Sequence, residues 1–229
     1  MLDRRYCYPL TTTDLASRDL LQCVALPSTA APPVQRHTDA LMREMGLPEA
    51  IHSDCGAPFA GPGIGHLTRL GLHWIKLGIR LERSRPASPA DNASHERMHR
   101  TLKQHTTRPP AANLRQQQRR FDCFRAEFNH ERPHEALLDR TPAECYRPSS
   151  RSFPHRLEEV QYPGHFERRR ITHGGSLCWH SARLFLSIVL AGETVGLEEI
   201  DDGVWSIYFG RHLLARLDAH VGKIIEVPV

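Results

Sequence analysis

The chain has 229 residues, of which 40% are hydrophobic, and this is enough to bury the core of one large domain or two small ones. No stretch approaches the roughly 18 consecutive apolar residues of a membrane span, and the N-terminus leads into no apolar signal segment, so we expect a soluble cytoplasmic protein without a membrane partner. The six cysteines form no Cys-x-x-Cys pair, which excludes the zinc ribbons and redox motifs built on that spacing.

The formal net charge of +4 is unevenly distributed along the chain. Residues 151–229 hold 9 Lys/Arg against 10 Asp/Glu, whereas residues 1–150 hold 21 against 16. A basic run can neutralise several DNA phosphates, although a solvated helix face explains charge alone equally well. Between residues 97 and 125 the single acid Asp122 stands among eight basic residues, namely Arg97, Arg100, Lys103, Arg108, Arg115, Arg119, Arg120 and Arg125.

The first part of the chain alternates between strand and helix patterns, which predicts an α/β fold. Asp54 would directly follow a short strand, at the end where open α/β sheets usually present functional groups. Gly46 and Pro48 supply the stop signal of the first helix. The expected elements are a strand at 6–13, a turn at 14–18, a strand at 19–26, a helix from about 34 to 45, a strand at 50–53, a helix around 67–77, a strand at 79–83 and a helix carrying Glu96 that Asp91 or Asn92 caps.

From about residue 150 the pattern changes to short apolar runs separated by turn signals, which indicates an all-β region. The runs 184–190 and 204–209 are expected to be inner strands of a small barrel or sandwich. We place the boundary at Pro148-Ser149-Ser150, which divides the chain into a domain at 1–148 and a domain at 149–229.

Asp54 and Glu96 are candidate metal ligands for phosphoryl transfer. Two-metal chemistry on DNA needs several carboxylates, because each metal must bridge an oxygen of the scissile phosphate while the protein holds the pair in place. Arg100 and Lys103 follow Glu96 by four and seven residues, so the three side chains share one helix face. A metal-bound acid and phosphate-binding bases would then line one groove.

These residues belong to an ordered series of motifs that resembles the transposases of bacterial insertion sequences, whose catalytic core is of the retroviral-integrase, RNase H-like type. The resemblance covers nearly the whole chain. Its motifs are Pro9-Leu10-Thr11 with Asp14-x-x-Ser17-Arg18, then Ser53-Asp54-x-Gly56-x-Pro58-Phe59, then Asn92-x-x-x-Glu96-x-x-x-Arg100-x-x-Lys103, then Asn129-x-x-Arg132-Pro133-His134, and finally Thr141-Pro142.

The resemblance implies an RNase H-like integrase core, with a mixed sheet flanked by helices, followed by a small all-β barrel of the SH3-like type. It makes Asp54 and Glu96 the second and third acids of an Asp-Asp-Glu triad that binds Mg²⁺ or Mn²⁺ and catalyses DNA strand transfer. The implied partners are the ends of the insertion element, target DNA in the nucleoid, and a second copy of the chain or a full-length transposase. The implied DNA-binding residues are Arg97, Arg100, Lys103 and Arg108, and the implied structural residues are Asp14, Asn92, Asn129 and Arg132.

The sequence departs from this family at the first acid of the triad. That Asp lies on a strand preceding the one at 6–13, and the chain begins at Met1 too late to include it, so we expect an N-terminally truncated protein with weak or no activity and doubtful metal occupancy. Cys55 stands where the family usually has Asn. Asp3 and Asp14 are possible substitutes, but an Asp in a turn commonly bonds its own backbone.

Two other functions stay open at this stage. One is a non-catalytic DNA-binding protein, or a regulator that pairs with a full-length transposase. The other is a zinc hydrolase, because His95-Glu96-Arg97-Met98-His99 fits the H-E-x-x-H pattern. His105 stands where a third zinc ligand occurs in a related pattern, but Leu102 replaces the Gly that would break the helix, so His105 is expected to point away.

Overall fold

The computed structural model describes residues 1–83 and 93–227. The chain forms two compact units, of which unit 1 comprises Met1–Gly46 and Ala87–Ser152, and unit 2 comprises Leu47–Pro86 and Phe153–Val229. The polypeptide therefore contributes two separate segments to each unit, and the predicted division between residues 148 and 149 stays a prediction. Within the described ranges, no helix is both long and apolar enough to cross a membrane.

Unit 1 begins with the predicted hairpin of β1 (Tyr8–Thr13) and β2 (Leu20–Leu26), which pair antiparallel with Tyr8 opposite Leu26. Asp14 closes the turn between them. Its carboxylate accepts hydrogen bonds from the backbone N–H of Ser17 at 2.7 Å and from the Ser17 hydroxyl at 2.6 Å. Asp14 thus bonds its own turn, as expected from its position.

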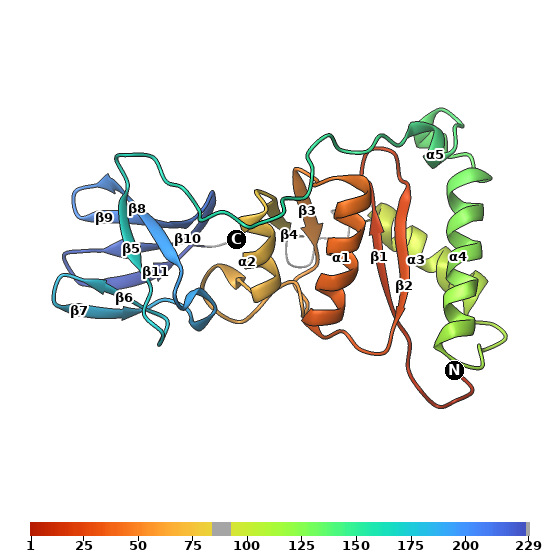
Figure 1. The fold of residues 1–229 in the computed structure, drawn as a ribbon, viewed down its shortest axis with the longest axis horizontal. Coiled ribbons are helices and arrows are strands. Elements are labelled where there is room, and N and C mark those ends of the chain that lie inside the picture. Colours follow the sequence, from red (N-terminus) through yellow and green to blue (C-terminus); the bar gives the residue numbers. More distant parts are fainter. Residues whose placement is uncertain (84–92, 228–229) are drawn as a thin grey trace. The chain divides into compact units, whose positions relative to one another are not determined.

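Helices cover both faces of this hairpin (Figure 1). Figure 1 shows α1 on one side of β1 and β2, with α3 and α4 on the other. Gly46 ends the first helix at a φ of +82°, and a Cβ at this position would collide with the carbonyl oxygen of Ser149, so the predicted stop signal is confirmed. The helical elements of unit 1 are α1 (Ala31–Met45), α3 (Ala93–Thr106), α4 (Leu114–His130), the 3₁₀ turn η3 (Glu135–Leu137) and α5 (Pro142–Cys145).

The core of unit 1 forms where β2, α3 and α4 meet. Its buried side chains are Leu20, Cys23, Met98, Leu102, Phe121, Phe124 and Phe128. A polar contact fixes the register of α4 against β2, because the Oδ1 of the buried Asn129 accepts from the backbone N–H of Leu20 at 2.8 Å and its Nδ2 donates to the carboxylate of Asp19 at 3.0 Å. Burial raises the pKa of the Asp19 carboxyl.

Unit 2 contains the predicted strand before Asp54. This strand is β3 (Ala50–Ser53), and it pairs parallel with β4 (Arg80–Arg83). Between them lie the 3₁₀ turn η1 (Ile64–His66) and α2 (Arg69–Lys76), which begins where the Thr68 side chain accepts from the N–H of Gly71. Among the residues that the structure describes, β1 pairs only with β2 and β3 only with β4, so the first part of the chain holds two separate strand pairs.

The tail is all-β, as predicted, and its strands are antiparallel throughout. Five strands form one sheet in the order β11-β10-β9-β8-β5, and β6 and β7 form a separate hairpin. The chain thus has the predicted class, a mixed α/β part followed by an antiparallel β region. The strands are β5 (Glu167–Arg170), β6 (Ser176–Trp179), β7 (Ala182–Phe185), β8 (Thr194–Asp201), β9 (Val204–Phe209), β10 (His212–Asp218) and β11 (Lys223–Glu226).

One strand prediction in the tail is wrong. The apolar run at 184–190 was expected to be a single inner strand, but β7 ends at Phe185 and residues Ile188–Leu190 form the 3₁₀ turn η4. The Ser187 hydroxyl accepts a hydrogen bond from the N–H of Val189, which favours a turn over an extended strand. The side chains of Phe185 and Ile188 are consequently exposed.

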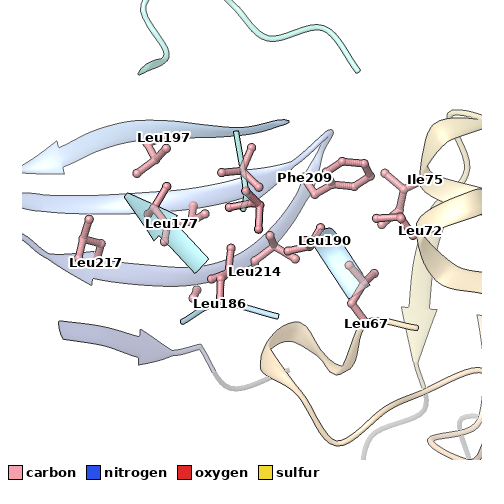
Figure 2. Packing of buried hydrophobic residues seen from close by; sticks show 14 of the residues in the cluster. Leu67, Leu72, Ile75, Leu177, Leu186, Leu190, Leu197, Phe209, Leu214 and Leu217 are labelled. Atoms are coloured by element: carbon pink, nitrogen blue, oxygen red, sulfur yellow. The ribbon is translucent and has the colours of Figure 1, made fainter. Parts of the chain in front are cut away.

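The core of unit 2 joins its two segments. Leu67, Leu72 and Ile75 come from the stretch around α2, and they pack into one cluster with residues of the tail sheet (Figure 2). Figure 2 shows Ile75 and Leu72 directed toward Phe209, with Leu67 near Leu190. The β tail therefore buries part of its apolar surface against residues that precede it by about a hundred positions in the chain.

We expect Gly196→Ala in β8 to destabilise the protein by about 1–3 kcal/mol through overpacking. A Cβ at this position would collide with the rings of Tyr162 and Phe166, and Tyr162 is held there by donating from its hydroxyl to the carbonyl of Thr194 at 2.9 Å. The matched control is Gly174→Ala, whose added Cβ would have its nearest neighbour at 3.9 Å. Urea denaturation measures both variants, and equal midpoints would contradict the packing of Tyr162 over Gly196.

We expect Asn129→Leu to cost at least about 2 kcal/mol, because the buried N–H of Leu20 and the carboxylate of Asp19 would both lose their partner. Cys123→Ala on the exposed side of α4 serves as the control and should change the free energy of unfolding by less than about 0.5 kcal/mol. A change in Asn129→Leu no larger than in the control would argue against Asn129 as the link between α4 and β2.

Candidate functional site

Helix α3 has a buried side and an exposed side, and its contacts with the core of unit 1 determine which residues lie on each side. Met98 and Leu102 are buried in the unit 1 core, with exposed fractions of 4% and 3%. Glu96, Arg100 and Lys103 are consequently exposed. The face that the sequence predicted for these three residues is present in the structure.

A groove of about 630 Å³ runs along this face of α3 within unit 1. Glu96, His99, Arg100 and Lys103 all line it, and its apolar wall includes Phe121 of α4. The groove therefore places one carboxylate beside two cationic side chains and an apolar surface. Cations of this kind bind phosphate, and an apolar wall suits a nucleotide base or sugar.

A second, smaller cavity of about 340 Å³ lies in unit 1 beside the N-terminal half of α3. It contains Arg97, which the sequence predicted to contact DNA, together with Arg18, Ser94 and His134. The Arg18 guanidinium donates to the Ser94 hydroxyl at 2.9 Å. Burial lowers the pKa of the His134 imidazole, and the nearby Arg18 lowers it further, which favours the neutral ring.

The fourth predicted DNA contact, Arg108, is exposed in the segment after α3 and lines neither of these two cavities. Arg97 and the pair Arg100 and Lys103 are likewise divided between the two cavities. The four residues predicted to bind DNA therefore do not line a single cavity.

The two histidines of the H-E-x-x-H pattern point at β1. The hydroxyl oxygen of Thr11 lies 2.7 Å from Nε2 of His99 and 3.1 Å from Nε2 of His95. The hydroxyl of Thr13 lies 3.0 Å from the other ring nitrogen of His95, Nδ1. Burial lowers the pKa of His99, which keeps its ring neutral.

The proposed third zinc ligand of that pattern lies elsewhere. His105 packs 5.9 Å from the ring of Phe124, and an Nη2 of Arg132 lies 3.2 Å from its ring nitrogen. This agrees with the expectation that a continuous helix carries His105 away from His95. In the described part of the chain, no group of three His, Cys, Asp or Glu side chains is arranged to hold a metal ion.

Asp54 belongs to unit 2, where it directly follows β3. Its side chain is exposed, and its Oδ1 accepts from the N–H of Gly56 at 3.1 Å. The turn continues as the N–H of Phe59 donates to the carbonyl of Gly56, and the Phe59 ring stacks 6.1 Å from Trp74. The Ser-Asp-x-Gly motif thus forms a compact turn that presents the carboxylate at the surface.

Asp54 and Glu96 supply the oxygen donors that Mg²⁺ prefers, but they belong to different units. Neither unit brings three acidic or other metal-binding side chains together among its described residues. Carboxylate oxygens suit a hard divalent cation such as Mg²⁺. However, the one predicted carboxylate ligand in each unit is too few to form a complete site for it.

The predicted structural residues have plain roles where they are described. Asp14 closes the β1–β2 turn and Asn129 ties α4 to β2. Arg132 follows the end of α4, where its guanidinium donates to the Glu127 carboxylate at 2.5 Å and keeps the pKa of that carboxyl low. Asn92, expected to cap α3, lies outside the described residues.

Sequence reasoning missed the convergence of Arg18, Ser94 and His134 on one cavity and of Thr11 on the two histidines. A signal existed for the second case, because Thr11 and Thr13 share one face of a strand and His95 and His99 share one face of a helix. The contact between these two faces depends on tertiary packing. Neither the two-residue period of the strand nor the 3.6-residue period of the helix specifies that packing.

Comparison with known proteins shows that part of the chain is similar to a protein family. A protein family described as "Integrase core domain" matches residues 77–142, a segment that includes Glu96, Arg100 and Lys103 but not Asp54. Two solved structures are also similar to the chain. The catalytic core domain of BIV integrase is 19% identical, with a TM-score of 0.47, and the match covers 61% of this chain and 90% of that one. The simian T-cell lymphotropic virus intasome in complex with the PP2A regulatory subunit B56 gamma is 13% identical, with a TM-score of 0.46 and coverage of 97% and 78%. By the family match, the segment that carries Glu96 is similar to an integrase core domain.

Proposed function

We propose that this protein is a DNA-binding relative of the integrases and insertion-sequence transposases, and that it acts on DNA in integration or transposition. The observation that carries the proposal is the groove along α3, in which Glu96 lies beside Arg100 and Lys103. The match of residues 77–142 to the integrase core domain supports it, because the matched segment contains this same helix.

The DNA-binding surface proposed here is formed by the exposed side of α3. Arg100 and Lys103 would bind backbone phosphates in the groove, and Arg97 would bind a phosphate at the smaller cavity on the neighbouring side. Arg108 would extend the surface beyond the end of the helix. The DNA would be the ends of a mobile element and the target into which the element is joined.

Glu96 and Asp54 are the proposed acids of strand transfer. When Mg²⁺ or Mn²⁺ is bound, it would supply the activation of water or of a DNA 3′-hydroxyl for attack on a phosphodiester. The protein's own part is to hold DNA phosphates on Arg100 and Lys103 beside the Glu96 carboxylate. Because no group of three His, Cys, Asp or Glu side chains comes together to hold a metal ion among the described residues, we propose that strand transfer by this chain is weak or absent.

The second candidate is a non-catalytic protein that binds DNA or pairs with a complete transposase. It is favoured by the same basic surface, which needs no third acid in order to bind phosphates. The two candidates share DNA binding and differ in whether any metal-dependent product forms. A zinc hydrolase is a weaker candidate, because the described residues place no third ligand beside His95 and His99.

We expect the double substitution of Arg100 and Lys103 to Gln to weaken binding to duplex DNA and to reduce the slope of log K against log salt by about 2, since each lost phosphate contact removes about 0.9. Fluorescence anisotropy over a salt series measures both quantities. The control is Arg36→Gln on the exposed side of α1, which should leave the slope unchanged. Equal slopes in the double variant and the control would refute the α3 groove as the DNA-binding surface.

We expect the unmodified chain to give little or no strand cleavage or joining on supercoiled DNA with Mg²⁺ or Mn²⁺, under conditions in which it binds that DNA. The reason is that the described residues bring no three metal-binding side chains together, which leaves a metal pair without enough ligands. Gel analysis compares the chain with Glu96→Gln and Asp54→Asn. Product from the unmodified chain that disappears in both variants would show instead that another acid completes the site.

A further inference from the structure

His95, His99 and Thr11 bring three donor atoms close together at the contact between α3 and β1. The two Nε2 atoms lie 3.1 Å apart, and the Thr11 hydroxyl oxygen lies 3.1 Å from one and 2.7 Å from the other. The two rings are 4.7 Å apart between their centroids. All three residues belong to unit 1, so this geometry is internal to one compact body.

The contact with Thr13 indicates which ring nitrogen of His95 carries the hydrogen. Thr13 lies 3.0 Å from Nδ1 of His95 and can accept its N–H, which leaves a lone pair on His95 Nε2. That nitrogen then faces His99 Nε2 and the Thr11 hydroxyl. A histidine whose Nδ1–H is held by a second group, with Nε2 directed at a shared point, has the arrangement that metal-binding histidines usually show.

The spacing fits one metal ion. Zn–N bonds are about 2.0–2.1 Å long, so two nitrogens bound to a tetrahedral ion lie about 3.3 Å apart. The observed separation of 3.1 Å requires only a small opening of the two rings. Burial also lowers the pKa of the His99 imidazole, which favours the neutral form that a metal requires.

We propose that His95 and His99 bind one divalent transition-metal ion of the zinc class, with the Thr11 hydroxyl as a weak third donor and water in the remaining position. Imidazole nitrogens favour Zn²⁺, Co²⁺, Ni²⁺ or Cu²⁺ over Mg²⁺, so this site is chemically distinct from one built on Asp54 and Glu96. It requires no DNA and no third carboxylate, and it does not depend on the proposed function.

A metal ion could reach both histidines from the solvent, and its binding would stabilise unit 1. His95 lines the smaller cavity and His99 lines the α3 groove, so each residue borders one of the two cavities. An ion held by two residues of α3 and by Thr11 of β1 would clamp the helix to the strand. The clamp would stabilise the folded chain, because the unfolded chain does not hold the three donors together.

The test uses the full chain, first freed of metal with a chelator. Titration with Co²⁺ should produce the intense visible absorption of a tetrahedral complex with one ion per chain, and Zn²⁺ should displace it while Mg²⁺ should not. At a Zn²⁺ concentration 100-fold above the dissociation constant, the folding equilibrium constant should rise about 100-fold in urea denaturation. The double variant His95→Gln with His99→Gln should lose both effects.

The matched control is His105→Gln, a histidine of the same helix that packs on Phe124 and should leave both effects intact. Should the double variant fail to fold, the unmodified chain still decides the matter, because Zn²⁺ should shift the imidazole NMR signals of two of the 15 histidines. Absence of Co²⁺ binding, or Zn²⁺ shifts confined to other histidines, would overturn the site. Retention of binding in a folded double variant would overturn it equally.

Discussion

The burial of one side of α3 is the constraint on which the candidate site depends. Met98 and Leu102 enter the core formed with β2 and α4, and this fixes the rotation of the helix about its axis. Glu96, Arg100 and Lys103 then necessarily line the groove, while His95 and His99 face β1. A rotation by one residue would bury a charge, so the apolar contacts and the exposed chemistry are two results of the same packing.

The surface around α3 combines an excess of positive charge with one carboxylate in each of the two cavities. Basic side chains occupy both cavities of unit 1, and the acid Glu96 lies within the larger one. Such a surface attracts a polyanion over a distance of several ångströms, and the carboxylates of Glu96 and Glu135 offset this attraction only in part. The proposed binding of DNA requires only basic side chains at the surface, whereas the proposed reaction also requires several carboxylates around a metal ion.

Local patterns predicted much of the fold. The β1–β2 hairpin, the stop of α1 at Gly46, the strand before Asp54 and the change to β structure in the tail each follow from residues close in sequence. Ile188 shows where this reasoning fails, because an apolar run favours a strand but a hydroxyl at Ser187 stabilises a turn. The approach of Thr11 to two histidines more than 80 positions away depends on packing between elements, which no local pattern contains.

The shared core of unit 2 has a consequence for the order in which the chain can fold during synthesis. Leu67, Leu72 and Ile75 leave the ribosome before Phe209 and Leu214, to which their cluster belongs. At a synthesis rate of about 5–20 residues per second, these apolar side chains stay exposed for roughly ten seconds or more before the tail strands that bury them have been made. Unit 1 also cannot complete its core until its second segment, Ala87–Ser152, has been made. The nascent chain therefore exposes apolar surface from both units at the same time. Chaperone binding to the stretch around α2 is the cellular behaviour that such an interleaved topology favours.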